Sequence, residues 1–187
     1  MAGLVAIKSF HVTDDLDTSI QFGSAAKPIP DTYAGLQFRC SMRADHDDGP
    51  AWLRISPFGV NSGSHSHHQI RSIENTSGGA PTGFKDSPTS SIVFPMMHTQ
   101  DSSDSFSYSP MVIDIMSYAN SNTATTFLYK TGSPSMRGDQ DQEGWNIIGS
   151  ATYKTANKIT YFSIDAYISV GGFRRGSTFD LYGYGSS

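Results

Sequence analysis

The chain is poor in charge and has almost no cysteine. Charged residues make up 16% of its 187 residues, below the usual share of about a quarter. Its one cysteine, Cys40, excludes an internal disulfide framework. Free cysteine is commonly a core residue, so we expect a buried thiol here and not a nucleophile. The net charge of −4 and the lack of a basic cluster argue against nucleic acid as a partner.

Long hydrophobic runs and targeting signals are also missing. No stretch approaches the roughly 18 apolar residues of a membrane-spanning helix, so we expect no membrane partner. The apolar run at residues 4–12 follows no basic segment and precedes no cleavage pattern. We therefore expect no signal peptide and synthesis in a cytoplasm.

Apolar and polar residues alternate along most of the chain, and helical periodicity is almost absent. The clearest alternating runs are 36–44, 110–119 and 177–184. Aromatic residues make up 12% of the chain, which argues against disorder. Eight or so strands separated by turn residues, with no linker, predict one all-β domain over 1–187, an antiparallel jelly-roll-like β-sandwich. Residues 59–90 are expected to form a long surface loop with one strand inside it, "HQIRSIE".

The segment "SHSHH" contains the first candidate metal ligands. On a strand, His65 and His67 would share one face, with His68 opposite. A transition-metal site needs three or four converging ligands, and this spacing supplies two. The nearby "ADHDDGP" adds acidic residues and one histidine without fixing their convergence. A solvated loop is the favoured interpretation.

The segment "DQDQEG" resembles the beginning of a calcium-binding loop. Asp139, Asp141 and Glu143 alternate as ligands would, but the twelfth position is Ser150 and not a bidentate glutamate. Calcium is therefore disfavoured. We predict neither a metal nor another cofactor.

Paired carboxylates for glycoside cleavage are the main enzymatic alternative. Asp114, Asp165 and Asp180 each lie in a predicted strand, but no local spacing brings two together. Nucleophile-elbow, zincin and P-loop motifs are absent, so we predict no catalytic residue. The many tyrosines allow a glycan-binding surface, because aromatic rings pack on sugar rings. We favour half-buried sandwich positions for most of them, since aromatic residues are good strand formers.

Four sequence blocks point to a family. They are "YAGLQFRCSMR" (33–43), "WLRISPF" (52–58), "VIDIMSYANSN" (112–122) and "GGFRRGSTFDLYG" (171–183). In order and spacing they resemble small tailed-bacteriophage virion structural proteins, whose C-terminal motif is G-S-x-F-x-L-Y-G. Segment 59–90 departs from that pattern. The positions to which we assign a structural or assembly role are Val112, Asp114, Tyr118, Asn120, Gly176, Phe179, Leu181, Tyr182 and Gly183.

The resemblance implies a function without catalysis. It implies a homo-oligomer, for which we expect a trimer, on the surface of a virion assembled in the host cytoplasm. Decoration of the capsid is the favoured role, with the major capsid protein or tail proteins as partners. A tail or fibre-tip protein that binds host-surface glycan is the alternative, and a polysaccharide-degrading enzyme ranks third. We expect residues 4–12 and 59–90 to make contacts.

The closing block also predicts its own packing. Glycines at 171, 172 and 176 permit a tight turn, after which Phe179, Leu181 and the ring of Tyr184 can be buried. Gly183 indicates the close approach of another backbone. The last strand therefore belongs inside a sheet, because an exposed terminal strand would fray.

Overall fold

The structure is a computed structural model that describes residues 3–14, 19–44, 51–57, 65–74, 82–86, 92–99, 108–133, 144–154, 156–167 and 172–185. The strands within these ranges are β1 (Val5–His11), β2 (Ser19–Phe22), β3 (Gly35–Ala44), β4 (Ala51–Pro57), β5 (His65–Glu74), β6 (Thr82–Asp86), β7 (Ile92–Thr99), β8 (Ser109–Met116), β9 (Thr125–Ser133), β10 (Gly144–Tyr153), β11 (Phe162–Tyr167) and β12 (Thr178–Tyr184). No helix of a length and hydropathy that would cross a membrane occurs in these ranges.

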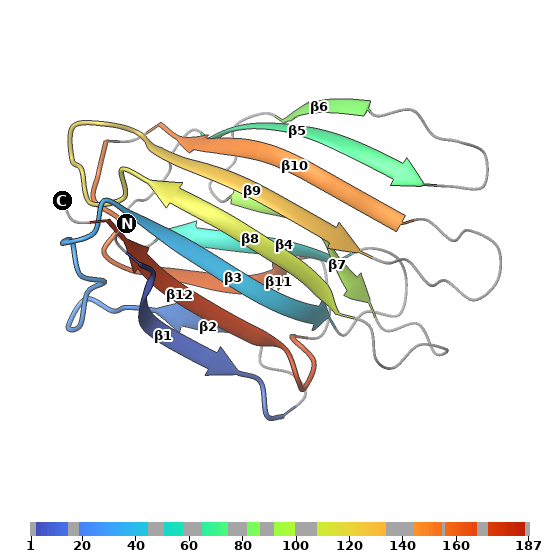
Figure 1. The fold of residues 1–187 in the computed structure, drawn as a ribbon, viewed down its shortest axis with the longest axis horizontal. Helices are drawn as coiled ribbons and strands as arrows, with labels where there is room; N and C mark the ends of the chain where they lie inside the picture. Colours follow the sequence, from blue (N-terminus) through green and yellow to red (C-terminus); the bar gives the residue numbers. More distant parts are fainter. Residues whose placement is uncertain are drawn as a thin grey trace.

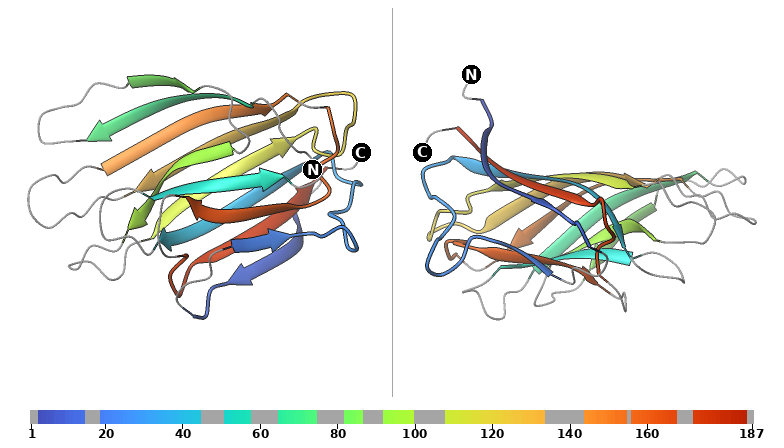
Figure 2. Two further views of the ribbon diagram at one scale, coloured as in Figure 1. Left: turned by 180° about the vertical axis from the view of Figure 1, so that it is seen from behind. Right: turned by 90° about the horizontal axis from the view of Figure 1, so that it is seen from below.

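The strands form two antiparallel sheets that face each other. The large sheet has the order β1-β12-β3-β8-β9-β10-β5-β6, and the small sheet has the order β2-β11-β4-β7. A short parallel pairing of β3 with β7, at Arg43–His98 and Ala44–Thr99, joins them at one end. Figure 1 shows the large sheet in front, and in the view from behind (Figure 2, left) the small sheet lies nearer the viewer as a second layer. The predicted all-β sandwich is confirmed.

The pairing between strands is nested. β1 pairs with β12, β2 with β11, β3 with β8 and β4 with β7, and the chain crosses between the sheets within this set. Strands β5 and β6 lie in the sequence between β4 and β7, and β9 and β10 lie between β8 and β11. Because β10 pairs with both β9 and β5, these two additional segments extend the large sheet beyond β8.

Aromatic side chains from both sheets form the centre of the core. Phe22 of the small sheet lies 5.6 Å from Phe38 of the large sheet, measured between ring centroids. It also stacks on Phe162 at 5.4 Å. Farther along the sandwich, Phe94 of the small sheet meets Tyr129 of the large sheet edge to face at 4.9 Å. Each such pair contributes about 0.5–1.5 kcal/mol of stability beyond the contribution from burying its rings.

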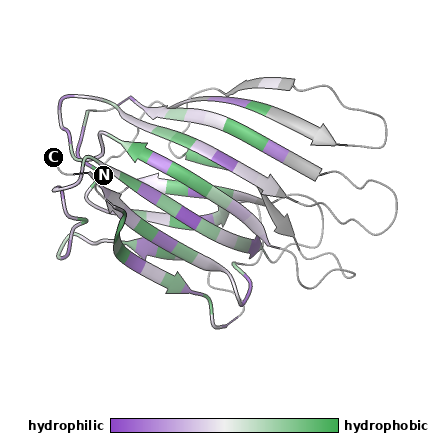
Figure 3. Cartoon of the chain, in the orientation of Figure 1, coloured by the Kyte–Doolittle hydropathy of each residue, from purple (hydrophilic) through white to green (hydrophobic). Residues whose placement is uncertain are grey.

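Alternation along the strands decides which side chains reach this core. Every second residue of β3, β8 and β12 is buried, and the hydropathy bands alternate along these strands in Figure 3. On β3 the buried set includes Phe38 and Cys40, as predicted. Arg43 is an exception, because it is 6% exposed although its position belongs to the predicted polar face.

The C-terminal strand is an interior strand of the large sheet. β12 pairs with β1 on one side and with β3 on the other. Phe179 and Leu181 are buried, and Phe179 lies 4.6 Å from Phe173 and 6.3 Å from Phe38 between ring centroids. The expectation that this strand lies within a sheet is confirmed, whereas Tyr184 is only partly buried.

Three details differ from the sequence-based expectations. The described residues contain 12 strands and not eight or so. Segment 59–90 contains a second strand, β6, as well as a longer β5, because β5 pairs with β10 and β6 pairs with β5. The alternating run "KITYFSIDAYI" (158–168) predicts a strand from Lys158, but β11 begins at Phe162, because Ile159 instead donates its backbone N–H to the Tyr118 carbonyl.

We predict that Phe179→Ala lowers the free energy of unfolding by about 3–5 kcal/mol, because it removes a fully buried ring that contacts two others. Tyr182→Ala is the matched control. It removes a ring from the outer face of the same strand, where the Arg39 guanidinium lies 5.3 Å from the ring centroid, and should cost about 1 kcal/mol or less. Urea unfolding monitored by fluorescence measures both, and equal losses would contradict this assignment of faces.

Candidate functional site

The sequence block "VIDIMSYANSN" ends in a tight turn directly after β8. Ser117 has a φ of 61°, a left-handed conformation that costs a residue other than glycine about 1–2 kcal/mol. The backbone N–H of Asn120 donates to the Ser117 carbonyl at 3.2 Å. The Asn120 side-chain oxygen then accepts from the N–H of Asn122 at 2.8 Å, as asparagine does in turns. Local hydrogen bonds thus hold the turn in this conformation.

Tyr118 ties this turn to two other segments. Its ring is fully buried, and its hydroxyl donates to the carbonyl of Pro30. Its own carbonyl accepts the N–H of Ile159 at 2.7 Å, and the N–H of Ile29 donates to the Thr160 carbonyl at 2.7 Å. Burial raises the pKa of the Tyr118 hydroxyl, so it stays a neutral donor in ordinary buffers.

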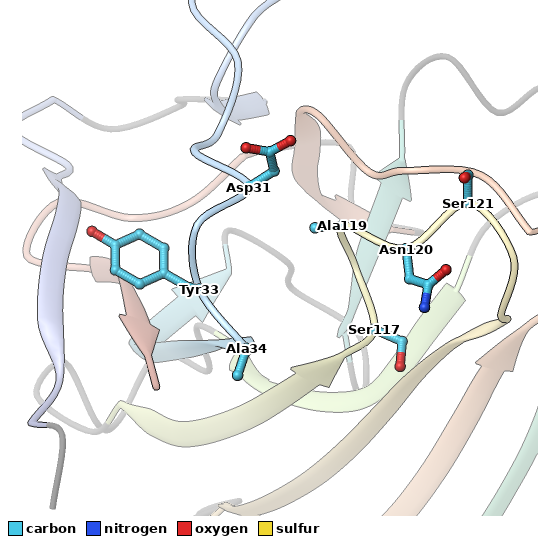
Figure 4. Close-up of a pocket in the computed structure, with 7 residues that line it drawn as sticks. All are labelled: Asp31, Tyr33, Ala34, Ser117, Ala119, Asn120 and Ser121. Carbon is cyan, nitrogen blue, oxygen red and sulfur yellow. The ribbon is translucent and has the colours of Figure 1, made fainter. Parts of the chain in front are cut away.

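A cleft of about 380 Å³ opens between residues 31–34 and 117–121. In Figure 4, Ala119 points from the turn toward residues 31–34, whereas the Tyr33 ring points away from the turn. A carboxylate, an amide and two serine hydroxyls provide donors and acceptors suited to a polar ligand such as a sugar. The lining residues are Asp31, Tyr33, Ala34, Ser117, Ala119, Asn120 and Ser121.

Asp31 lies at the rim of the cleft and is paired with a lysine. Lys158 Nζ lies 3.0 Å from Asp31 Oδ2, and both side chains are well exposed to solvent. The hydrogen bond from Lys158, followed by its charge, lowers the pKa of the Asp31 carboxyl. Asp31 is therefore ionised and accepts hydrogen bonds. A general acid would need a raised pKa, and the pKa of Asp31 is lowered.

A second candidate surface lies on the outer face of the small sheet. Trp52 of β4 and Tyr167 of β11 are direct cross-strand partners, and Tyr167 is 38% exposed. The Arg54 guanidinium lies 5.0 Å from the centroid of the Tyr167 ring. Arg54 Nε also lies 2.8 Å from Asp165 Oδ1, which holds the guanidinium in place. This cluster combines aromatic rings with a fixed cation, which suits stacking and hydrogen bonding to sugars.

The outer face of the large sheet carries a chain of polar contacts. Gln37 donates from Nε2 to Asp114 Oδ1 at 2.7 Å, and Arg39 donates from Nε to Gln37 Oε1 at 2.6 Å. Arg39 in turn lies over the ring of Tyr182. The pKa of Tyr184 is raised, first by burial and then by the Asp114 charge. Asp114 thus faces outward, as its alternation predicts, and Tyr182 and Asp114 belong to one surface network.

The remaining residues of the closing block serve the framework. Gly176 has a φ of 90°, and the adjacent Arg175 carbonyl accepts from the Tyr108 hydroxyl at 2.8 Å. Gly183 lies directly beneath the ring of Tyr33. The prediction that another backbone approaches Gly183 is therefore wrong. A tyrosine ring fills the space that a side chain would occupy.

The three candidate carboxylates are not brought together. Asp165 lies on the outer face of the small sheet, whereas Asp114 and Asp180 lie on the outer face of the large sheet. β3 lies between the strands of Asp114 and Asp180, and their partners on β3, Gln37 and Arg39, are two residues apart. Strand geometry therefore places the backbones of Asp114 and Asp180 about 12 Å apart. Glycosidase pairs lie roughly 5–10 Å apart.

The metal candidates fall largely outside the described residues. His65 and His67 lie two positions apart on β5, so their backbone arrangement is the one predicted, but their side chains are outside the described part. Asp139 and Asp141 lie in 134–143, which is also outside it. Within the described ranges, no group of three or more His, Cys, Asp or Glu side chains converges.

Sequence reasoning missed both the cleft and the Trp52–Tyr167 pair. The turn residues of "AKPIPDTYAG" and "YANSN" were visible, but nothing in either block indicated that they meet. Of the tyrosines at positions 108, 118, 129, 153, 161 and 167, Tyr118, Tyr129 and Tyr153 are buried, which agrees with the favoured interpretation. Tyr167 is the one among them that is well exposed.

Comparison with known proteins found no match to this chain among family models, curated proteins or solved structures.

We predict that Gly183→Ala destabilises the protein by about 1–3 kcal/mol, because the added Cβ overlaps the Tyr33 ring. In a Tyr33→Ala background the same substitution should cost much less. Gly83→Ala is the control, since an added Cβ there meets no atom within 4 Å. Thermal and urea unfolding measure the cycle, and additive effects of Gly183→Ala and Tyr33→Ala would contradict the proposed overlap.

We predict that Cys40 is inert in the folded protein. Burial raises the pKa of its thiol, so the reactive thiolate does not form in mildly alkaline buffer, and the side chain is only 7% exposed. Ellman's reagent should label the chain in denaturant and fail to label it under native conditions. Rapid native labelling would show that Cys40 is accessible.

Proposed function

We propose that the chain is a non-enzymatic structural protein of a tailed-bacteriophage particle, displayed as a homo-oligomer on the particle surface, with decoration of the capsid as its role. The observation that carries this proposal is the nested strand order, β1-β12-β3-β8 against β2-β11-β4-β7. We assign this order to a jelly roll extended by β5, β6, β9 and β10. Jelly rolls are a common architecture of viral capsid domains.

The positions of the family-like residues support the proposal. Phe179 and Leu181 are core residues of an interior strand, and Tyr118 anchors the turn after β8. Because Gly176 and Gly183 have no side chain, Tyr108 and Tyr33 can pack directly against the backbone at these two positions. These residues build the framework, as expected if the resemblance reflects a shared structural role and not a shared reaction.

The arrangement of acidic groups also favours a role without catalysis. Asp114 and Asp180 are too far apart for a glycosidase pair, and Asp165 is paired with Arg54 on the other sheet. The cleft contains one carboxylate, Asp31, which is paired with Lys158. A hydrolase would need a second group of matched pKa within reach of the scissile bond.

The edge strand β1 is the surface we propose for contact with the particle. It pairs with β12 alone among the described strands, so its other edge is open to another chain. Val5, its first residue, is 50% exposed, and Leu4 directly before it is 42% exposed. An open edge with exposed apolar residues suits strand addition by a neighbouring protein, in which backbone hydrogen bonds supply the affinity.

A second candidate function is the binding of host-surface glycan by a tail or fibre-tip protein. The exposed Tyr167 ring opposite Trp52, with Arg54 fixed beside it, specifically favours this candidate. The cleft with Asn120 and Ser121 offers further hydrogen-bonding groups.

We predict that the purified chain co-sediments with undecorated capsids of the phage that encodes it and does not pellet with host cells. Val5→Lys should weaken capsid binding at least about tenfold, because it places a charge at the open edge. Tyr167→Ala is the matched control and should leave capsid binding unchanged.

Binding to cells that is lost in Tyr167→Ala, together with no binding to capsids, would replace decoration by receptor binding. Release of reducing sugar from host polysaccharide by the wild-type chain would instead establish an enzyme. Binding to neither capsids nor cells would remove the support for both functions.

A further inference from the structure

Two isoleucines lie side by side in solvent on the outer face of the large sheet. Ile148 of β10 and Ile70 of β5 are direct cross-strand partners, and they are 69% and 63% exposed. Leu128 of β9 lies diagonally from Ile148 and is 44% exposed. We call these three residues the isoleucine face. Single exposed apolar residues are ordinary, but a contiguous group on a sheet usually marks a contact surface.

Two of the positions around the isoleucine face are glycines. Gly83 of β6 is the cross-strand neighbour of Ile70, and an added Cβ there would meet no atom within 4 Å. Gly132 of β9 is the cross-strand neighbour of Asn146, beside Ile148 on the same face. Because neither glycine carries a side chain, a second flat sheet can approach to the roughly 10 Å spacing at which sheets pack.

Charges at the border suit an identical surface. Lys130 is the cross-strand neighbour of Ile148, and Asp114 is the cross-strand neighbour of Leu128. The border of this face therefore offers one cation and one carboxylate on adjacent strands. A second copy related by a two-fold axis offers the same pair, so lysine and aspartate of the two copies can face each other.

The available area matches that of a stable dimer. The five strands β3, β8, β9, β10 and β5 span roughly 24 Å at 4.8 Å per strand, eight residues of each extend about 27 Å, and the five residues of β6 add a narrow strip. The resulting face of about 700 Å² is close to the roughly 800 Å² that each partner contributes to a standard interface. A second copy of the chain has a face of the same size and can cover this face completely.

We propose that the isoleucine face binds a second copy of the same chain, sheet against sheet, with Ile70, Leu128 and Ile148 at its centre. This inference deepens the proposed function and rests on its homo-oligomeric part, since it names the surface through which copies associate. A face that binds itself produces pairs, so the expected assembly is a dimer and not the trimer that the resemblance suggested.

Sedimentation equilibrium of the full chain over a wide concentration range tests this proposal. The wild type should be a dimer at micromolar concentration, and Ile148→Lys should raise the dimer Kd by at least about tenfold, because both copies then bury a lysine. Val5→Lys is the control, since it charges an exposed apolar position on β1 and should leave the dimer intact. Unchanged thermal unfolding would show that Ile148→Lys is folded.

Charge exchange supplies the second test. Lys130→Glu should weaken the dimer, and the double substitution Lys130→Glu with Asp114→Lys should restore it. A wild type that stays monomeric, a trimer, or a dimer insensitive to Ile148→Lys would each overturn the proposal.

The same variants are then tested for capsid binding. A monomeric wild type whose capsid binding is lost in Ile148→Lys would make this face a capsid contact, whereas a dimer that ignores capsids would leave the self-association standing and remove the proposed function.

Discussion

Contact between the two sheets through the rings of Phe22, Phe38 and Phe162 is the interaction on which the rest of the structure depends. These rings come from β2, β3 and β11, so they join strands far apart in the sequence. Phe94 and Tyr129 provide a second junction between the sheets. Arg43 is the one charged residue among the buried positions described. The sandwich therefore derives its stability mainly from apolar burial, which is non-directional, and the edge-to-face geometry of the rings then fixes how the sheets are aligned.

Tyrosines paired with glycines shape the surfaces around this core. The Tyr33 ring covers Gly183, the Tyr184 ring covers Gly35, and the Tyr129 hydroxyl end lies against Gly149. A glycine in a strand ordinarily weakens it, and an aromatic ring across the backbone compensates for the missing side chain. The family-like closing motif is thus explained by packing, without any appeal to catalysis.

Potential contact surfaces lie where the framework leaves side chains exposed. The open edge of β1, the Trp52–Tyr167 cluster and the isoleucine face point in different directions, one from the edge and two from opposite faces of the sandwich. A protein that decorates a particle needs at least two such surfaces, one for the particle and one for its own copies. The division of roles proposed for β1 and the isoleucine face meets that need.

The sequence by itself determined which face of β8 and β12, and of most of β3, is buried. Alternation placed Phe38, Cys40 and Phe179 in the core and Asp114 outside, because successive side chains of a strand point to opposite sides. Only the tertiary structure decided which strands are neighbours. It placed β5 beside β10 and β6 beside β5, brought Asp31 to the turn at Asn120, and set Trp52 opposite Tyr167. These pairings join residues distant in the sequence, and a period of two carries no information about the partner of a strand.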